Sequence, residues 1–106
     1  MSETRIRVLL ADDHAVVRAG YRRVLENTAN MQVVAEAGSG EEAYALVKKV
    51  PVHVVVMDLT MDGLGGLEAL RRIRARVPKV KVLIFSMHVT AAFANQAFQS
   101  GAAGYV

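Results

Sequence analysis

Val54-Val55-Val56-Met57-Asp58 (residues 54–58) is the stretch that decides the fold, because four consecutive apolar residues end in an acid. Pro51 precedes it, and we expect a strand over 52–57, apolar throughout except at His53. Strands as apolar as this are buried on both faces, as in parallel sheets covered by helices. Asp58 closes the strand, where burying a carboxylate without partners costs free energy. The stretch therefore predicts a buried parallel strand that delivers a functional acid.

Outward from this stretch, short β-branched runs alternate with segments of helical period. Such βαβα alternation predicts an α/β fold, a doubly wound five-stranded parallel sheet with helices on both faces. Further strands are expected at 6–11, 31–37, 80–85 and 103–106, and helices at 14–27, 40–49, 67–77 and 90–101.

The first expected helix carries an apolar stripe that should face the sheet, with charged side chains on its water-exposed face. The stripe consists of Val16, Val17, Gly20, Tyr21, Val24 and Leu25, and the charged face of Arg18, Arg22, Arg23 and Glu26. A fifth strand also calls for a helix after it, and none follows within residues 1–106. We expect one domain over 1–106 that is incomplete at its C-terminus, truncated before the last helix, with an apolar sheet face exposed and reduced stability.

Length and composition narrow the class of protein. The chain has 106 residues, 53% of them hydrophobic and 22% charged, which fits one globular domain and excludes disorder. The absence of cysteine excludes disulfides, a thiol nucleophile and Cys-ligated metal sites. A net charge of +3 is too small to indicate nucleic-acid binding by itself. No signal peptide and no apolar run of about 20 residues is present, so we expect a soluble, cytoplasmic protein.

Acidic side chains follow two of the expected strands. Asp12 and Asp13 follow the first, Asp58 closes the third, and Ser86 follows the fourth. Ligands of open α/β sheets bind at the carboxyl ends of the strands, and the acids converge there if the strand order is 2-1-3-4-5. At separations of about 5 Å, each pair of carboxylates repels by about 3 kcal/mol. Either one acid keeps its proton or a hard cation such as Mg²⁺ lies between them.

Simpler interpretations exist for these residues. Asp12 and Asp13 could be capping acids of the following helix, and the Ser86 hydroxyl could bond to the backbone. Gly38-Ser39-Gly40 imitates a dinucleotide fingerprint, but it follows the second strand rather than the first, and Ser39 with Glu42 forms a capping box. A phosphatase of the haloacid dehalogenase type needs an acid two residues after its nucleophile, where this chain has Thr60.

Four segments together resemble the receiver domain of bacterial response regulators. They are Leu9-Leu10-Ala11-Asp12-Asp13-His14, Val55-Val56-Met57-Asp58-Leu59, Leu83-Ile84-Phe85-Ser86 and Gly101-Ala102-Ala103-Gly104-Tyr105-Val106. The first and last segments, with Val17-Arg18-Ala19-Gly20, are similar to the NarL/FixJ-type subgroup, whose members usually carry a LuxR-type helix-turn-helix domain downstream. The resemblance implies the flavodoxin-like receiver fold, and the order 2-1-3-4-5 is taken over from that fold rather than derived.

The resemblance also implies a role for each candidate residue. Asp58 would accept a phosphoryl group from a sensor histidine kinase. Asp13, Asp58 and the backbone carbonyl of Thr60 would hold Mg²⁺, with Asp12 acting through water. Ser86 would bond to the phosphoryl group, and Tyr105 would turn inward as the switch aromatic. Thr60 and His88 would border the attacking water.

The same resemblance implies a phosphoacceptor switch that assists its own phosphotransfer and dephosphorylation but is not otherwise an enzyme. Its output would be transcription regulation by promoter DNA binding through a domain outside this chain, and a homodimer is allowed. The sequence departs from the family at Asp62, where proline is common, and the family's phosphate-binding lysine would fall two residues past Val106. The alternatives are a flavodoxin-like ligand-binding module and a degenerate receiver that works without phosphate.

Overall fold

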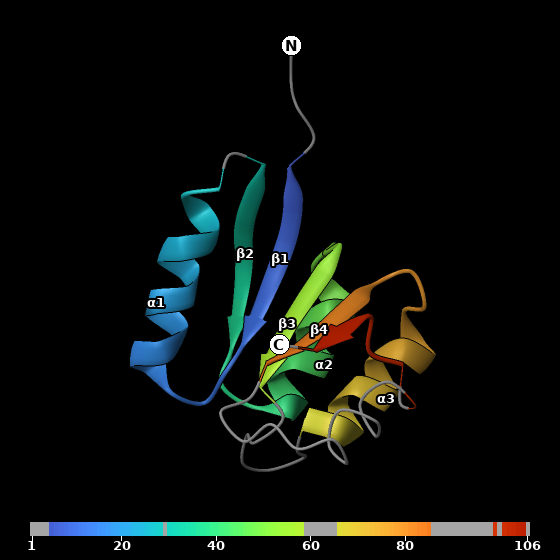
Figure 1. The fold of residues 1–106 in the computed structure, drawn as a ribbon. Coiled ribbons are helices and arrows are strands. Elements are labelled where there is room, and N and C mark those ends of the chain that lie inside the picture. The colour runs from blue at the N-terminus through green and yellow to red at the C-terminus, as the bar shows by residue number, and fades with distance from the viewer. Residues whose placement is uncertain (1–4, 29, 59–65, 86–98, 100, 106) are drawn as a thin grey trace.

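The computed structural model describes residues 5–28, 30–58, 66–85, 99 and 101–105. Within them, a five-stranded parallel sheet has the order β2-β1-β3-β4-β5, as the doubly wound fold requires (Figure 1). The strands are β1 (Ile6–Ala11), β2 (Met31–Ala37), β3 (Val54–Asp58), β4 (Lys81–Phe85) and β5 (Gly104–Tyr105). The helices are α1 (Ala15–Glu26), α2 (Gly40–Lys49) and α3 (Gly66–Arg76).

The predicted elements agree with the observed ones to within a few residues. The largest difference is at β3, which begins at Val54 and includes Asp58. His53 lies just before it, where its Nδ1 accepts a hydrogen bond from the Arg7 N–H at 2.9 Å. The helix expected over 90–101 falls almost wholly outside the described residues. None of the helices in the described ranges is long and apolar enough to cross a bilayer.

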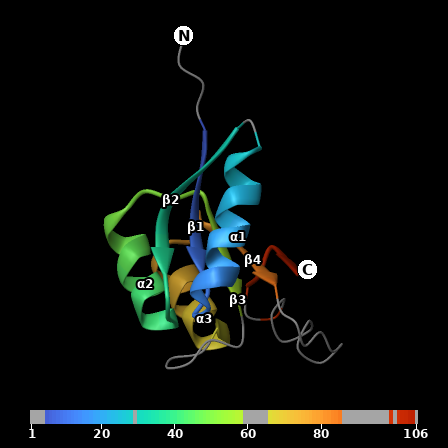
Figure 2. The same cartoon turned by 90° about the vertical axis from the view of Figure 1, so that its left-hand side faces the viewer.

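The helices lie on both faces of the sheet but in unequal numbers. Helix α1 contacts β1 and β2 on one face, and α2 and α3 pack together over the other face (Figure 2). In Figure 2, β1 and β2 stand between α2 and α1. Among the described residues, α1 is therefore the single helix on its face.

The two faces of the sheet bury clusters of different size. Thirteen buried residues form one cluster on the α2 and α3 side, among them Leu9, Met57 and Leu70. On the α1 side the buried cluster contains Leu10, Val33 and Phe85 alone among the described residues. Alternate residues of each strand point to opposite faces, so the strands supply both clusters but fill them unequally.

The apolar stripe of α1 is not buried as expected, so that prediction is wrong. No residue of α1 is buried: the exposed fractions are 85% for Val16 and 66% for Val24. Leu25 is half-buried against the smaller cluster, and the Tyr21 ring lies 4.5 Å from that of Phe85. The physical reason is that no second helix in the described ranges stands beside α1, so much of its stripe has no apolar surface to contact.

The start of α2 confirms the capping interpretation of the glycine-rich turn. Ser39 is the N-cap, and its Oγ accepts a hydrogen bond from the Glu42 N–H at 3.1 Å. Glu42 in turn accepts from the N–H of Gly38 at 2.6 Å, one residue earlier than in the usual capping box. These side chains serve the helix end, which accounts for the turn without a dinucleotide.

Candidate functional site

The strand register brings the acids of β1 and β3 together. In the pairing of β1 with β3, Ala11 lies opposite Met57, and β1 ends there. Asp12 follows directly, and Asp58 is the last residue of β3. Since both strands run in the same direction, the two carboxylates leave the sheet at the same edge.

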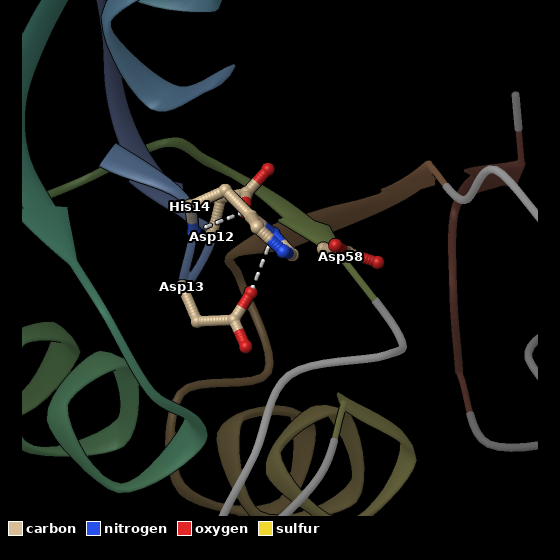
Figure 3. A group of neighbouring side chains, drawn as sticks. All are labelled: Asp12, Asp13, His14 and Asp58. Carbon is tan, nitrogen blue, oxygen red and sulfur yellow. Dashed lines mark hydrogen bonds and ion pairs between the residues drawn. The ribbon is translucent and has the colours of Figure 1, made fainter. Parts of the chain in front are cut away.

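Four side chains form the cluster at this edge: Asp12, Asp13, His14 and Asp58 (Figure 3). Each offers one donor atom, and these atoms all lie within 4.8 Å of one another. Asp12 is 1% exposed and Asp58 is 6% exposed, whereas Asp13 is less deeply buried. The convergence expected from the sequence is therefore observed for all three carboxylates.

His14 is the member of the cluster that the sequence analysis did not single out. Its Nδ1 lies 2.8 Å from Asp13 Oδ1 and 3.2 Å from Asp12 Oδ1. The hydrogen bond with Asp12 and the charge of Asp13 raise the pKa of His14 above its ordinary value. Its position next to the acid pair was the available signal, although adjacency along the chain does not tell where a ring points.

Asp12 is held through its backbone as well as its side chain. Its Oδ1 accepts the N–H of His14 at 2.8 Å, which fixes the start of α1. Its carbonyl accepts from Arg18 Nη1 at 2.5 Å, and Arg18 Nε donates to Glu36 at 2.9 Å. Arg18 was expected on the water-exposed face of α1, and that prediction is wrong, because its guanidinium bridges the Asp12 turn and β2.

Glu36 is the carboxylate that holds Arg18 in this position. Burial alone would raise its pKa, but the hydrogen bonds from Arg18 and Arg22 outweigh that effect and lower the pKa below the ordinary value. Both arginines reach the same carboxylate, so α1 is tied to β2 by ion pairs as well as by packing. These ties fix the turn that carries Asp12 and Asp13.

The donor set fits a hard divalent cation. Carboxylate oxygens are preferred ligands of Mg²⁺. Asp12 Oδ2 is buried and makes no hydrogen bond within the described part of the chain. Buried carboxylate oxygens normally have partners, so this oxygen is available to a cation.

The other residues given a role by the family resemblance lie outside the described residues or have no described side chain. Thr60, Ser86 and His88 lie outside them, as does Asp62, where the sequence departs from the family. Tyr105 is part of β5, opposite Ile84 of β4, but its side chain is not among those described. The structure thus brings together the acids and leaves the other predicted roles as expectations.

Comparison with known proteins gives concordant matches. The profile of the response regulator receiver domain matches residues 8–106. The chain is 45% identical over 101 residues to the response regulator UvrY of Escherichia coli (strain K12), covering 95% of this chain and 46% of UvrY. It is 41% identical to the transcriptional activator protein ExaE of Pseudomonas putida, covering 93% of this chain and 46% of ExaE. The chain therefore spans about half the length of the curated relatives it matches.

A solved structure is similar in both sequence and fold. It is a two-component response regulator of the LuxR family from Aurantimonas sp. SI85-9A1, with a TM-score of 0.92 and 48% identity. The match covers 96% of this chain and 73% of that one.

Proposed function

The chain belongs to the response regulator receiver domain family, and from that premise we propose that it is the phosphoacceptor switch of a two-component phosphorelay, with Asp58 as the acceptor. The observation that supports this proposal best is the meeting of Asp12, Asp13 and Asp58 within 4.8 Å at the carboxyl edge of the sheet. Response regulators of this kind are phosphorylated by histidine kinases.

The chemical step is a phosphoryl transfer to a carboxylate. An oxygen of Asp58 attacks phosphorus and forms an O–P bond, while the N–P bond of the kinase's phosphohistidine breaks and its electron pair stays on the imidazole. Asp58 suits this role because it ends a rigid strand and is 6% exposed, so a small part of its surface meets the donor. The product is an acyl phosphate on Asp58.

The neighbouring carboxylates make the reaction possible by binding a cation. Asp13, Asp58 and the backbone carbonyl of Thr60 would hold Mg²⁺, and Asp12 would act through water. When bound, Mg²⁺ supplies positive charge that neutralises the phosphoryl oxygens and the crowded carboxylates. Arg18 keeps the turn that carries Asp12 and Asp13 in place through the Asp12 carbonyl.

The remaining roles follow the family and complete the proposal. Ser86 would donate a hydrogen bond to a phosphoryl oxygen, and Tyr105 would turn inward after Ser86 moves. Thr60 and His88 would border the water that removes the phosphoryl group, so the domain assists its own dephosphorylation. New charge at Asp58 would in this way bias a two-state switch.

The output lies outside this chain in the proposal. A DNA-binding domain downstream of residues 1–106 would regulate transcription at promoters, in line with the name of ExaE. The receiver would be completed by a further helix past Val106, function in the cytoplasm, receive its phosphoryl group from a sensor histidine kinase, and could form a homodimer.

Acetyl phosphate tests the proposal directly. In the presence of Mg²⁺, the protein should gain about 80 Da, the mass of one phosphoryl group replacing a proton. Asp58→Asn should abolish the gain because an amide is not a nucleophile for this reaction. Glu68→Gln, which alters an exposed acid on α3, is the matched control and should be labelled normally.

The alternatives predict different results. Equal labelling of the wild type and Asp58→Asn would mean that another residue is modified and would refute the assignment. A wild type that takes up no phosphoryl group, either alone or extended by about 20 residues to include a further helix and its connection, would favour a phosphate-independent receiver or a ligand-binding module.

A further inference from the structure

The ring nitrogen Nδ1 of His14 belongs to the acid cluster and takes no part in capping the helix. His14 is the N-cap residue of α1, but its side chain makes no capping hydrogen bond to the helix. Its backbone N–H is already satisfied by Asp12 Oδ1 at 2.8 Å. The ring is therefore not required for starting the helix, and its contacts are with the carboxylates of Asp12 and Asp13.

The ring lies among the carboxylates although water is accessible to it. The side chain is 66% exposed, yet Nδ1 lies 2.8 Å from Asp13 Oδ1 and 3.2 Å from Asp12 Oδ1. Figure 3 shows the imidazole turned toward the acids rather than outward. His14 thus adds one nitrogen donor to three carboxylate donors, all within 4.8 Å of one another.

A second observation indicates that the cluster is built for a cation. Asp12 is 1% exposed, and its Oδ2 has no hydrogen-bond partner among the described residues. A buried, unpartnered carboxylate oxygen is costly unless a cation, or a water held by that cation, interacts with it. The His14 nitrogen and this oxygen belong to the same cluster.

The donor set bears on which ion is preferred. Mg²⁺ and Ca²⁺ select oxygen ligands, whereas first-row ions such as Co²⁺, Ni²⁺ and Zn²⁺ also bind imidazole nitrogen well. Three carboxylates alone would form an oxygen site. One imidazole added to them makes a mixed oxygen and nitrogen site, which raises the affinity for first-row ions relative to Mg²⁺.

We propose that His14 is a direct ligand, through Nδ1, of the divalent ion that Asp13 and Asp58 would hold directly and Asp12 through water, and that it gives this site a preference for first-row transition ions over Mg²⁺. The inference rests on the metal binding in the proposed function. In the observed geometry Nδ1 faces the carboxylates of Asp12 and Asp13 as a hydrogen-bond donor. Coordination replaces the Nδ1 proton by the cation and leaves the neutral ring with its proton on Nε2, on the exposed side of the ring.

The selectivity is measured by titrating the protein, without an affinity tag, with Co²⁺ and with Mg²⁺ at about pH 8, above the ordinary pKa of imidazole. The informative variant is His14→Asn, because asparagine is a good N-cap and should preserve α1. We expect the Co²⁺ affinity of His14→Asn to fall at least about tenfold more than its Mg²⁺ affinity, the order of effect expected when an imidazole ligand is lost.

Spectroscopy identifies the ligand independently of affinity. The Co²⁺-loaded wild type should show the strongly shifted carbon-bound ring protons of one histidine by NMR, and His14→Asn should lack them. His53→Gln is the matched control because His53 precedes β3, at the opposite end of that strand from Asp58. It should retain both the signal and the wild-type ratio of affinities.

The outcomes separate this inference from the proposed function. If Mg²⁺ binds but the Co²⁺ to Mg²⁺ ratio is the same in wild type and His14→Asn, His14 is not a ligand, and the phosphoacceptor proposal is unaffected. A Co²⁺ complex without shifted histidine ring protons would overturn the inference in the same way. If neither ion binds to the wild type, the metal site itself is refuted and both proposals fail.

Discussion

Asp12 and Asp58 become neighbours because β1 and β3 end at the same edge of the sheet. Each acid belongs to a different βα unit, and the parallel register places Ala11 opposite Met57 just before them. Asp13 joins them from the start of the turn to α1. Close carboxylates repel, and the repulsion is strongest where water is excluded. The repulsion therefore destabilises the folded protein locally, at the residues that we propose to bind the cation.

Removing one of these charges should stabilise the metal-free protein. Asp13→Asn keeps the size of the side chain and lowers the repulsion within the cluster, which is about 3 kcal/mol for a pair at about 5 Å before the offsetting charge of His14 is counted. We expect the free energy of unfolding in EDTA to rise by about 1 kcal/mol, measured by urea denaturation. The added stability on Mg²⁺ binding should shrink.

A matched surface substitution guards against a general charge effect. Glu68→Gln removes an acid whose exposed pairs with Arg71 and Arg72 are each worth at most about 1 kcal/mol. It should leave the unfolding free energy unchanged or slightly lower. A lower free energy of unfolding for Asp13→Asn in EDTA would contradict the prediction that repulsion between the carboxylates destabilises the metal-free protein.

Glu36 predicts a specific pH dependence. Its pKa is lower in the folded state than in the unfolded chain, so its contribution to stability is complete above the unfolded value near 4.5 and is lost as pH falls through the folded pKa. Glu36→Gln should be less stable than wild type at neutral pH, and the difference should shrink below about pH 4.5.

Denaturation curves across the acid range measure this difference. Glu26→Gln serves as the control because Glu26 pairs with Arg22 on the exposed side of α1. That variant should stay close to wild type at each pH. A gap between wild type and Glu36→Gln that stays constant down to about pH 3 would exclude the proposed linkage.

Helix α1 is held differently from the other helices. Helix α2 buries Ala43 and Val47 in the larger core, and α3 buries Leu70 and Ile73 there. Helix α1 buries none of its residues and is attached by Leu25, by the Tyr21 ring and by the ion pairs that Arg18 and Arg22 make with Glu36. Its amphipathic pattern is as clear as that of a buried helix, but the contacts are fewer.

Two adjacent substitutions in α1 test this attachment. Val24→Ser changes a side chain that is 66% exposed and should alter the unfolding free energy by no more than about 0.5 kcal/mol. Leu25→Ser removes the contact with Leu10, Val33 and Phe85 and should cost about 2 kcal/mol. Chemical denaturation of both variants gives the comparison, and equal effects would mean that α1 is not oriented as described.

In the described part of the chain, one face of the sheet carries a large buried cluster and the other a small one. The larger cluster joins the sheet to α2 and α3, while the α1 side has a small cluster in the described residues. Burial of apolar surface is the main source of stability, so free energy is distributed unevenly across the sheet. The acid cluster lies at the carboxyl ends of β1 and β3. Its residues Asp12, Asp13 and His14 lead directly into α1, the helix on the face with the smaller cluster.

Hydrogen exchange should reveal this asymmetry. Backbone amides of α1 should exchange through local opening, at a free energy at least about 1 kcal/mol below that of global unfolding. Amides of Leu9, Val55 and Ile84, which belong to the larger core, should exchange only through global unfolding. Native-state exchange measured against denaturant distinguishes the two, and α1 amides as protected as those of Val55 would refute the prediction.

The local pattern of apolar and polar residues was sufficient to predict the fold class and the positions of the acids along the chain. The apolar run at 54–57 with its terminal acid, and the alternation of strands with helices around it, follow from side-chain periodicity, which each segment carries by itself. The capping role of Ser39 likewise depends on residues a few positions apart. The strand order came with the family resemblance, and the observed sheet has that order.

Tertiary structure alone decided which side chains meet across elements. The exposure of Val16 depends on what covers its face of the sheet. The inward position of Arg18 depends on Glu36, which belongs to another element. The contact of the His14 nitrogen with Asp13 depends on the direction of the ring. Periodicity tells which face of a helix is apolar, but burial is a property of two surfaces in contact. The sequence by itself therefore determined the strands, the helices and the acids that follow the strands. Only the folded structure determined which side chains contact one another, because contacts between distant segments have no local signature.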